Sequence, residues 1–259
     1  MVRVEHDLPN RLGELIVAPP LKSRVARVLR EFRLQDKLKS HALSHRRKLM
    51  FCGPPGTGKT MTAAIIAGEL GLPLCTILLD KLVTKFMGET GAKLRQVFDA
   101  IAQRTGVFLF DEFDAIGAER NRDNDVGEIR RVLNAFLQLI EQDRSDIIIT
   151  ATNNHGILDQ ALFRRFDDVL TYQLPGKEDV AGLLDNCLQK FRPATLPASK
   201  VALAAKGLSH AELTLACRDA IKDAILADRS QIDGQTLLNM LAERRAANTG
   251  SAKPRKRHA

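Results

Sequence analysis

The sequence predicts an α/β protein with a five-stranded parallel sheet flanked by helices, followed by a small all-α domain. Two observations predict this fold class. Up to residue 174, short apolar runs alternate with segments of helical periodicity, as in chains that join parallel strands through crossover helices. After LPG at 174–176, only helical patterns remain. The 259 residues, 44% of them hydrophobic, are enough for one large domain with a small one attached.

Each predicted strand is an apolar run bounded by glycine or by polar turn residues. Between the strands lie segments with helical periodicity, which predicts crossover helices. We therefore expect a large α/β domain over residues 1–175. In chain order, the strands are KLMFC (48–52), LPLCTILL (72–79), VFLFD (107–111), DIIITAT (146–152) and DVLTYQL (168–174).

The remainder of the chain predicts a small helical domain over residues 176–247 and a basic, disordered tail over 248–259. Ser209 followed by Glu212 has the spacing of a capping box, which predicts that the second helix begins at Ser209. The three expected helices are 177–191, 209–227 and 235–247.

Composition excludes several classes of protein. No apolar run approaches the roughly 18 to 20 residues of a membrane span, and MVRVEHDLPN at the start has charges where a signal peptide has its apolar segment. We therefore expect a soluble, cytoplasmic protein. Widely separated cysteines without a C-x-x-C pair predict small buried hydrophobic residues instead of a zinc site or a disulfide framework. They are Cys52, Cys75, Cys187 and Cys217.

The net charge of +8 is concentrated at the two ends of the chain. Residues 1–48 carry 12 Lys and Arg against 5 Asp and Glu, and the final SAKPRKRHA adds four positive charges. Basic ends of this kind can bind nucleic acid or an acidic partner. A solvated helix face around residues 21–40 with a disordered tail is the other interpretation.

The strongest local motif is GPPGTGKT at residues 53–60, which fits G-x-x-x-x-G-K-[ST] between a predicted strand and a predicted helix. In this pattern the backbone N–H groups and the start of the helix surround phosphate oxygens, which predicts a P-loop NTPase core. We expect Lys59 to reach the β- and γ-phosphates and the Thr60 hydroxyl to bind Mg²⁺. The alternative is a glycine-rich turn without a nucleotide. The expected nucleotide-binding residues are Gly53, Pro54, Pro55, Gly56, Thr57, Gly58, Lys59, Thr60 and Met61.

The apolar strand in VFLFDEFDAIG ends in two adjacent carboxylates. We expect Asp111 to hold the magnesium shell and Glu112 to orient and deprotonate the attacking water, which a hydrolase needs and a kinase avoids. A solvated acidic turn is the alternative. Asp114 is expected to be structural.

With these motifs in order, the chain resembles the AAA clade of the AAA+ ATPases over residues 15–241. ATNN at 151–154 is similar to the first sensor of that family, which implies that Asn153 positions the attacking water near Glu112 and the γ-phosphate. Little sequence precedes residue 12, so we expect a stand-alone, bacterial-type member without an N-terminal domain.

LDQALFRRFDD at 158–168 is similar to the family segment that carries arginine fingers. The resemblance implies that Arg164 or Arg165 enters the nucleotide site of a neighbouring subunit, so that hydrolysis requires assembly. In the commoner family form, a proline and a glycine separate the two arginines, which leaves the choice between them open. A surface arginine bound to Asp167 or Asp168 is the alternative.

KGLSHAEL at 206–213 resembles the small-residue motif that begins the second lid helix in this clade, with His210 where a glycine is usual. The resemblance places His210 and Ala211 near the nucleotide. It also places Ile16 and Val17, from LIVAPP, at the adenine.

KFMGETG at 85–91 lies where the clade forms its first pore loop, which implies that Phe86 and Met87 project into the channel of a ring and bind polypeptide. NRDNDVG at 121–127 would supply a more polar second loop. The alternative is that Phe86 is a core aromatic residue.

The sequence as a whole therefore predicts an ATPase that uses ATP and Mg²⁺ to remodel polypeptides as a homo-oligomeric, hexameric ring. The alternative function is an AAA+ ATPase of the loader or transposition-regulator type, which acts on nucleic acid or nucleoprotein and which the basic ends would suit. A P-loop kinase does not fit Glu112 or the segment that contains Arg164. By resemblance alone, a separate protease or adaptor protein is a further expected partner, and no membrane partner is expected.

Overall fold

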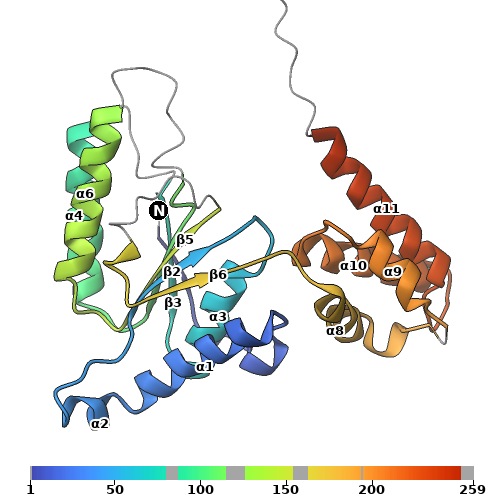
Figure 1. Cartoon of the computed structure of the whole chain (residues 1–259), viewed down its shortest axis with the longest axis horizontal. Helices are drawn as coiled ribbons and strands as arrows, with labels where there is room; N and C mark the ends of the chain where they lie inside the picture. The colour runs from blue at the N-terminus through green and yellow to red at the C-terminus, as the bar shows by residue number, and fades with distance from the viewer. Residues whose placement is uncertain (1, 80–86, 115–125, 154–162, 194, 252–259) are drawn as a thin grey trace, which may run out of the picture. The chain divides into compact units, whose positions relative to one another are not determined.

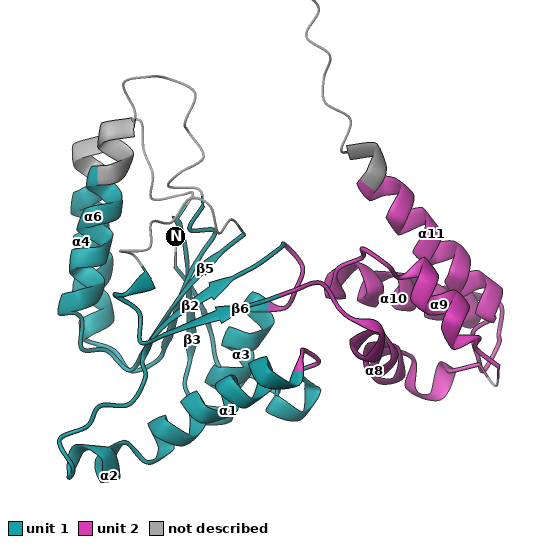
Figure 2. Ribbon diagram, viewed as in Figure 1, with its two compact units in different colours: residues 1–15, 19–54, 59–172 teal, residues 16–18, 55–58, 173–259 magenta. Residues whose placement is uncertain are grey.

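The computed structural model describes residues 2–79, 87–114, 126–153, 163–193 and 195–251, and the side chains of 87–89, 126–130 and 249–251 lie outside this description. The chain divides into two units (Figure 2). Unit 1 consists of Met1–Leu15, Pro19–Pro54 and Lys59–Tyr172, and unit 2 consists of Ile16–Ala18, Pro55–Gly58 and Gln173–Ala259.

Unit 1 contains a six-stranded, mostly parallel sheet with the order β1-β3-β4-β5-β2-β6, which confirms the predicted α/β class (Figure 1). All five predicted strands are present and parallel. Their inner runs are apolar because both faces of the sheet are covered, as is usual for parallel strands. They are β2 (Lys48–Cys52), β3 (Leu74–Leu78), β4 (Val107–Asp111), β5 (Ile147–Thr152) and β6 (Asp168–Thr171).

The sixth strand, β1 (Val2–Glu5), was missing from the sequence prediction. It runs antiparallel to β3, with Val4 opposite Cys75. Its four residues alternate between valine and a charged residue, and none of them is buried. A strand without a buried face leaves no apolar run in the sequence, so the pattern that revealed the other five did not reveal this one.

Unit 1 also contains helices that lie against the sheet (Figure 1). Helix α1 buries a stripe formed by Leu21, Val25, Val28 and Leu29, which is the spacing of one helix face. Its basic residues lie outside this stripe, and Arg24 and Arg33 form ion pairs with Asp168 and Glu69. The helices are η1 (Leu12–Glu14), α1 (Pro19–Arg33), α2 (Gln35–Lys39), α3 (Lys59–Leu70), α4 (Met87–Ala102) and α6 (Val126–Gln142).

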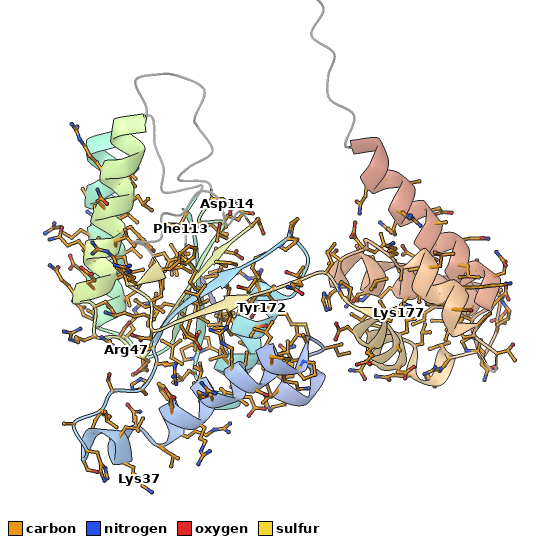
Figure 3. The ribbon with its side chains drawn as sticks, viewed as in Figure 1. Lys37, Arg47, Phe113, Asp114, Tyr172 and Lys177 are labelled. Atoms are coloured by element: carbon orange, nitrogen blue, oxygen red, sulfur yellow. The ribbon has the colours of Figure 1, made fainter. Side chains whose placement is uncertain are left out.

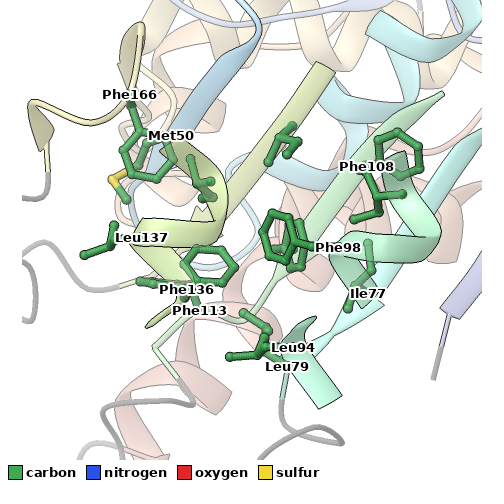
Figure 4. Packing of buried hydrophobic residues seen from close by; sticks show 14 of the residues in the cluster. Met50, Ile77, Leu79, Leu94, Phe98, Phe108, Phe113, Phe136, Leu137 and Phe166 are labelled. Carbon is green, nitrogen blue, oxygen red and sulfur yellow. The ribbon is translucent and has the colours of Figure 1, made fainter. Parts of the chain in front are cut away.

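An aromatic cluster fixes α4 and α6 to the sheet (Figure 4). Phe136 of α6 lies 5.8, 5.1 and 4.8 Å, between ring centroids, from Phe98, Phe110 and Phe113. All four side chains are buried, and each contributes about 1.5 to 3 kcal/mol through its apolar surface. The cluster thereby holds the last residues of β4 in place.

Unit 2 is helical, and all three predicted helices are present. Ser209 caps α10 as expected: its backbone N donates to Glu212 Oε2 at 2.6 Å, and Glu212 N donates to its hydroxyl at 3.4 Å. The sequence prediction missed the seven-residue α9, which buries only Val201. The helices are α8 (Lys177–Leu188), η4 (Gln189–Phe191), α9 (Ala198–Ala204), α10 (His210–Leu226) and α11 (Gly234–Ser251).

The cysteines divide into two groups. Cys52, Cys75 and Cys217 are buried, as predicted, whereas Cys187 is half-buried, so that prediction was wrong for Cys187. Within the described residues, no helix is both long and apolar enough to cross a membrane.

Candidate active site

Residues 53–60 form the loop between β2 and α3, which we call the phosphate loop. Its three glycines have φ of 152°, 72° and 98° at Gly53, Gly56 and Gly58, values that side chains disfavour. A Cβ atom at Gly53 would lie only 2.3 Å from the carbonyl oxygen of Tyr172. The predicted glycine pattern therefore follows from the backbone shape.

Lys59 is buried inside this loop. Its Nζ donates to the carbonyl oxygens of Gly53 and Pro54 at 2.8 and 2.9 Å and to Asn153 Oδ1 at 2.8 Å. Burial lowers the pKa of Lys59, and the negative charge of Asp111 acts in the opposite direction. The structure therefore brings together two predicted site residues that lie 94 positions apart in the sequence.

Thr60 and Asp111 form the second pair of the site. The Thr60 hydroxyl donates to Asp111 Oδ2 at 2.9 Å, and the other carboxylate oxygen accepts from the Glu112 backbone at 2.9 Å. A hydroxyl and one carboxylate, completed by substrate phosphate oxygens, are a common ligand set for Mg²⁺. The residues present therefore fit that ion. The described residues contain no cluster of three His, Cys, Asp or Glu side chains that could hold a metal by itself.

Glu112 follows directly after β4 with a left-handed backbone, φ 56°. This conformation costs a non-glycine residue of order 1 to 3 kcal/mol. Its neighbours enforce it, because Phe113 N donates to the carbonyl of Ala151 at 2.9 Å and the Phe113 ring is buried in the aromatic cluster. The turn leaves Glu112 exposed beside Asp111.

Asp114 has a more specific position than the sequence suggested (Figure 3). Its Oδ1 accepts from the backbone N of Asn153 at 3.0 Å and from the Thr152 hydroxyl at 3.3 Å. It therefore orients the predicted sensor residue at the end of β5. The only sequence signal was a third acid, three residues after Asp111.

Residues 55–58 of the phosphate loop belong to unit 2 and contact the start of α10 within that unit. Ala211 N, in the first turn of α10, donates to the carbonyl oxygen of Gly56 at 3.0 Å. A Cβ atom at Gly56 would lie 2.6 Å from Ser209 Oγ. Both ring nitrogens of His210 are buried, beside the backbone of Ile16, which also belongs to unit 2. Burial lowers the pKa of His210, while the charge of Asp179 acts in the opposite direction.

Comparisons with known proteins identify a family whose members are ATPases, in agreement with the phosphate loop and the adjacent carboxylates. Residues 49–174 match the family model described as "ATPase family associated with various cellular activities (AAA)". A relative named as an uncharacterized AAA family ATPase, y4kL, from Sinorhizobium fredii, is 36% identical over 230 residues, which cover 87% of this chain and 68% of the relative. The chain belongs to the AAA family of ATPases. As an AAA ATPase it binds and hydrolyses ATP.

Two other relatives have more specific names. An ATP-dependent zinc metalloprotease FtsH from Acidothermus cellulolyticus is 29% identical, over 87% of this AAA ATPase and 35% of the relative. A proteasome-activating nucleotidase from Methanoculleus marisnigri is 32% identical, over 74% of this chain and 49% of the relative. The chain thus spans half or less of the length of these two proteins.

The two arginines of the AAA ATPase have different surroundings. Arg165 Nη1 lies 2.6 Å from Glu141 Oε2 of the same chain, whereas Arg164 is exposed and has no ion pair or hydrogen bond to another described residue. Within the described residues, neither Arg164 nor Arg165 bonds to Asp167 or Asp168, so the predicted alternative is wrong there. Asp167 accepts from the backbone N of Arg47 and of Lys48, both at 2.9 Å, and Asp168 pairs with Arg24.

The other predicted positions contribute less to the site. Phe86 and residues 121–125 lie outside the described residues, as does the side chain of Met87, whose backbone begins α4. Met61 is 43% exposed on α3. Ile16 is half-buried and Val17 is buried, both in unit 2, with Ile16 Cγ2 3.9 Å from the Cβ position of Gly182.

Proposed function

We propose that this AAA ATPase uses Mg²⁺ and ATP to remodel polypeptides as a homo-oligomeric ring. The arrangement of Thr60, Asp111 and Glu112 at the end of β4 is the observation that supports hydrolysis of ATP with Mg²⁺. Next to Thr60, Lys59 donates a hydrogen bond to Asn153 Oδ1 at 2.8 Å. The proposal that the substrate is a polypeptide rests on the family resemblance and on relatives named for proteolysis and for proteasome activation.

Each residue at the site has a separate task in hydrolysis. Lys59 exchanges its loop carbonyl partners for phosphate oxygens and neutralises their charge. Thr60 and Asp111 would hold Mg²⁺, which would supply positive charge to neutralise the phosphate oxygens. Glu112 takes a proton from the attacking water. Asn153, held by Asp114, orients that water with its amide.

Assembly completes the site in this proposal. Arg164 is exposed, whereas Arg165 has a carboxylate partner in its own chain. Arg164 is therefore the better candidate to enter the nucleotide site of a neighbouring subunit, where a guanidinium stabilises the charge that spreads over the γ-phosphoryl oxygens. By resemblance the ring is a hexamer, with Phe86 and Met87 as its contact to polypeptide. A separate protease or adaptor protein would then select the substrate.

A trapping experiment tests the function directly. A Glu112→Gln form, held in ATP, should retain its substrates, and mass spectrometry of the retained material identifies them. The matched control is Glu178→Gln, which changes an exposed glutamate in the first turn of α8 and should release substrate like the parent. ATPase activity should also rise with unfolded protein. If DNA stimulates the ATPase instead, and the effect weakens steeply with salt, the polypeptide proposal is wrong.

A further inference from the structure

Cys187 and Cys217 lie on two helices of unit 2 that pack against each other. Cys187 is in the last turn of α8, and Cys217 is in the middle of α10. Cys217 belongs to the apolar core of unit 2, against which Cys187 packs, and the Cys187 thiol donates to Thr214 Oγ1 at 3.9 Å. Thr214 and Cys217 are three residues apart, on one face of α10. Cys187 therefore faces both side chains across the interface between the two helices.

The two thiols differ in access and in acidity. Cys187 is half-buried, whereas Cys217 is fully buried. The hydrogen bond from the Cys217 thiol lowers the pKa of Cys187, although burial opposes this, and the Thr214 hydroxyl and the charge of Arg218 lower it further. The same hydrogen bond, together with burial, raises the pKa of Cys217. The result is an accessible thiolate beside a protonated thiol, the pairing found in reactive cysteines.

The other two cysteines provide an internal comparison. Burial raises the pKa of Cys52 to about 11 and also raises the pKa of Cys75. Both lie in strands of unit 1 and remain protonated at neutral pH. Among the four cysteines, only Cys187 combines access with a lowered pKa.

We propose that Cys187 and Cys217 form a site of reversible oxidation by hydrogen peroxide, with a disulfide between α8 and α10 as the product. The Cys187 thiolate attacks one peroxide oxygen, which forms an S–O bond and breaks the O–O bond. The departing hydroxide takes a proton from solvent, and Cys187 becomes a sulfenic acid. The Cys217 sulfur then displaces the sulfenic hydroxyl, which leaves as water with the Cys217 proton. Two thiols lose two electrons, and the peroxide becomes two water molecules.

The disulfide would act on a helix that contacts the phosphate loop. Helix α10 begins at His210, and Ala211 N donates to the carbonyl oxygen of Gly56. A covalent bond at Cys217 fastens this helix to α8 within unit 2. A dithiol reverses the bond by exchange through a mixed disulfide and is itself oxidised.

Peptide mapping of the whole chain tests the site. The reduced protein is treated with hydrogen peroxide, alkylated and digested with trypsin without reduction. Peptides 178–190 and 207–218, which carry Cys187 and Cys217, should appear linked and two hydrogens lighter than their sum. Dithiothreitol should separate them, and a non-reducing gel should show no cross-linked dimer. Cys75→Ser should retain the link, whereas Cys187→Ser and Cys217→Ser should lose it.

The experiment also has a clear contrary outcome. If peroxide oxidises free peptide 178–190 but leaves no linked pair in the folded wild-type chain, the proposal is wrong. This measurement needs no variant, so a misfolded mutant cannot account for the result. In Cys217→Ser, oxidation of Cys187 should stop at the sulfenic acid, which dimedone labels. Labelling of Cys52 or Cys75 with equal yield would contradict the assigned selectivity.

Discussion

Lys59 Nζ donates a hydrogen bond to Asn153 Oδ1 at 2.8 Å, which joins the phosphate loop to the end of β5. Asn153 is in turn held through its backbone N by Asp114. Lys59 and Asn153, proposed to bind phosphate and to orient water, are thus connected to each other, and the position of Asn153 depends on Asp114, a carboxylate outside the usual motifs.

Asp114→Ala should lower kcat about tenfold, equivalent to ~1.4 kcal/mol in the barrier, because Asn153 loses the acceptor that fixes its position. The KM for ATP should change little, since Lys59 keeps its two loop carbonyl partners. Steady-state ATPase assays separate the two effects. Asp114→Asn retains an acceptor oxygen and should recover most of the rate. A rise in KM with kcat unchanged would contradict the positioning role.

Lys59→Ala and Glu112→Gln should affect different steps. The lysine variant should bind ATP about 10- to 100-fold more weakly, because a charge-assisted hydrogen bond contributes ~1.5 to 3 kcal/mol. The glutamate variant should bind ATP normally and lose turnover. Fluorescent-nucleotide titration and phosphate release measure the two steps. An equal loss of binding in both variants would refute the separate roles.

Arg164→Ala should reduce ATPase activity by on the order of 10³-fold, as expected for loss of an arginine finger. Arg165→Ala should reduce ATPase activity less than Arg164→Ala. Arg165 has a partner in its own chain, Glu141, and loss of this partly exposed ion pair costs only ~0 to 1 kcal/mol of stability. Activity per subunit should also rise with protein concentration until the ring forms. The measurement is a concentration series of ATPase rates, with sedimentation to report assembly.

A mixing experiment tests whether the arginine acts between subunits. Glu112→Gln subunits mixed with Arg164→Ala/Arg165→Ala subunits should recover some activity, at interfaces that unite an intact Glu112 with intact arginines. Sedimentation or cross-linking must first show that the two variants assemble together. Absence of recovery in proven mixed assemblies would exclude action in trans.

Phe86→Ala should abolish remodelling while it leaves the melting temperature and most basal ATPase activity unchanged, if Phe86 contacts substrate. Phe86→Tyr should remain active, because a tyrosine hydroxyl is tolerated in a wet channel. The matched core control is Phe98→Ala, which should lose about 3 to 5 kcal/mol of stability from the aromatic cluster. If Phe86→Ala melts as early as Phe98→Ala and loses its ATPase, Phe86 belongs to the core.

The stability of the fold should fall as the pH drops below about 6.5, the ordinary pKa of histidine. Burial lowers the folded-state pKa of both His45 and His210, so between the folded and ordinary values the unfolded chain binds more protons. His210→Gln should remove part of this loss, whereas His6→Gln, at an exposed position, should not. Urea unfolding at pH 5 and pH 7 measures the difference. Equal pH dependence in all three proteins would contradict the assignment to His210.

The sequence was sufficient to predict the fold where one residue pattern determines both the backbone structure and the position of the candidate site residues. Five apolar runs became five parallel strands. Because the C-terminal ends of parallel strands lie at one side of a sheet, Asp111 and Asn153 contact the phosphate loop there. Glycine spacing also predicted the loop, since Gly53, Gly56 and Gly58 have backbone angles that other residues disfavour.

The elements that escaped prediction are short or depend on packing. Strand β1 lacks a buried face and α9 buries a single valine, so neither produces a strong periodic signal. The pairing of Arg165 with Glu141 and the contact of Cys187 with Thr214 depend on how two elements are rotated against each other. The periodicity of a sequence predicts which face of a helix is buried, but it does not predict which residue of the neighbouring element lies opposite that face.

Strand β1 has a consequence for the proposed action on extended polypeptides. An uncovered edge of a sheet offers a row of free N–H and C=O groups, a template on which another chain can add as a strand. By pairing with β3, Val2–Glu5 covers that edge. The new outer strand presents Arg3 and Glu5, paired at 3.3 Å, in a run of only four residues. Short, charged edges discourage strand addition, so these residues would keep an unfolded substrate from aggregating onto the ATPase core.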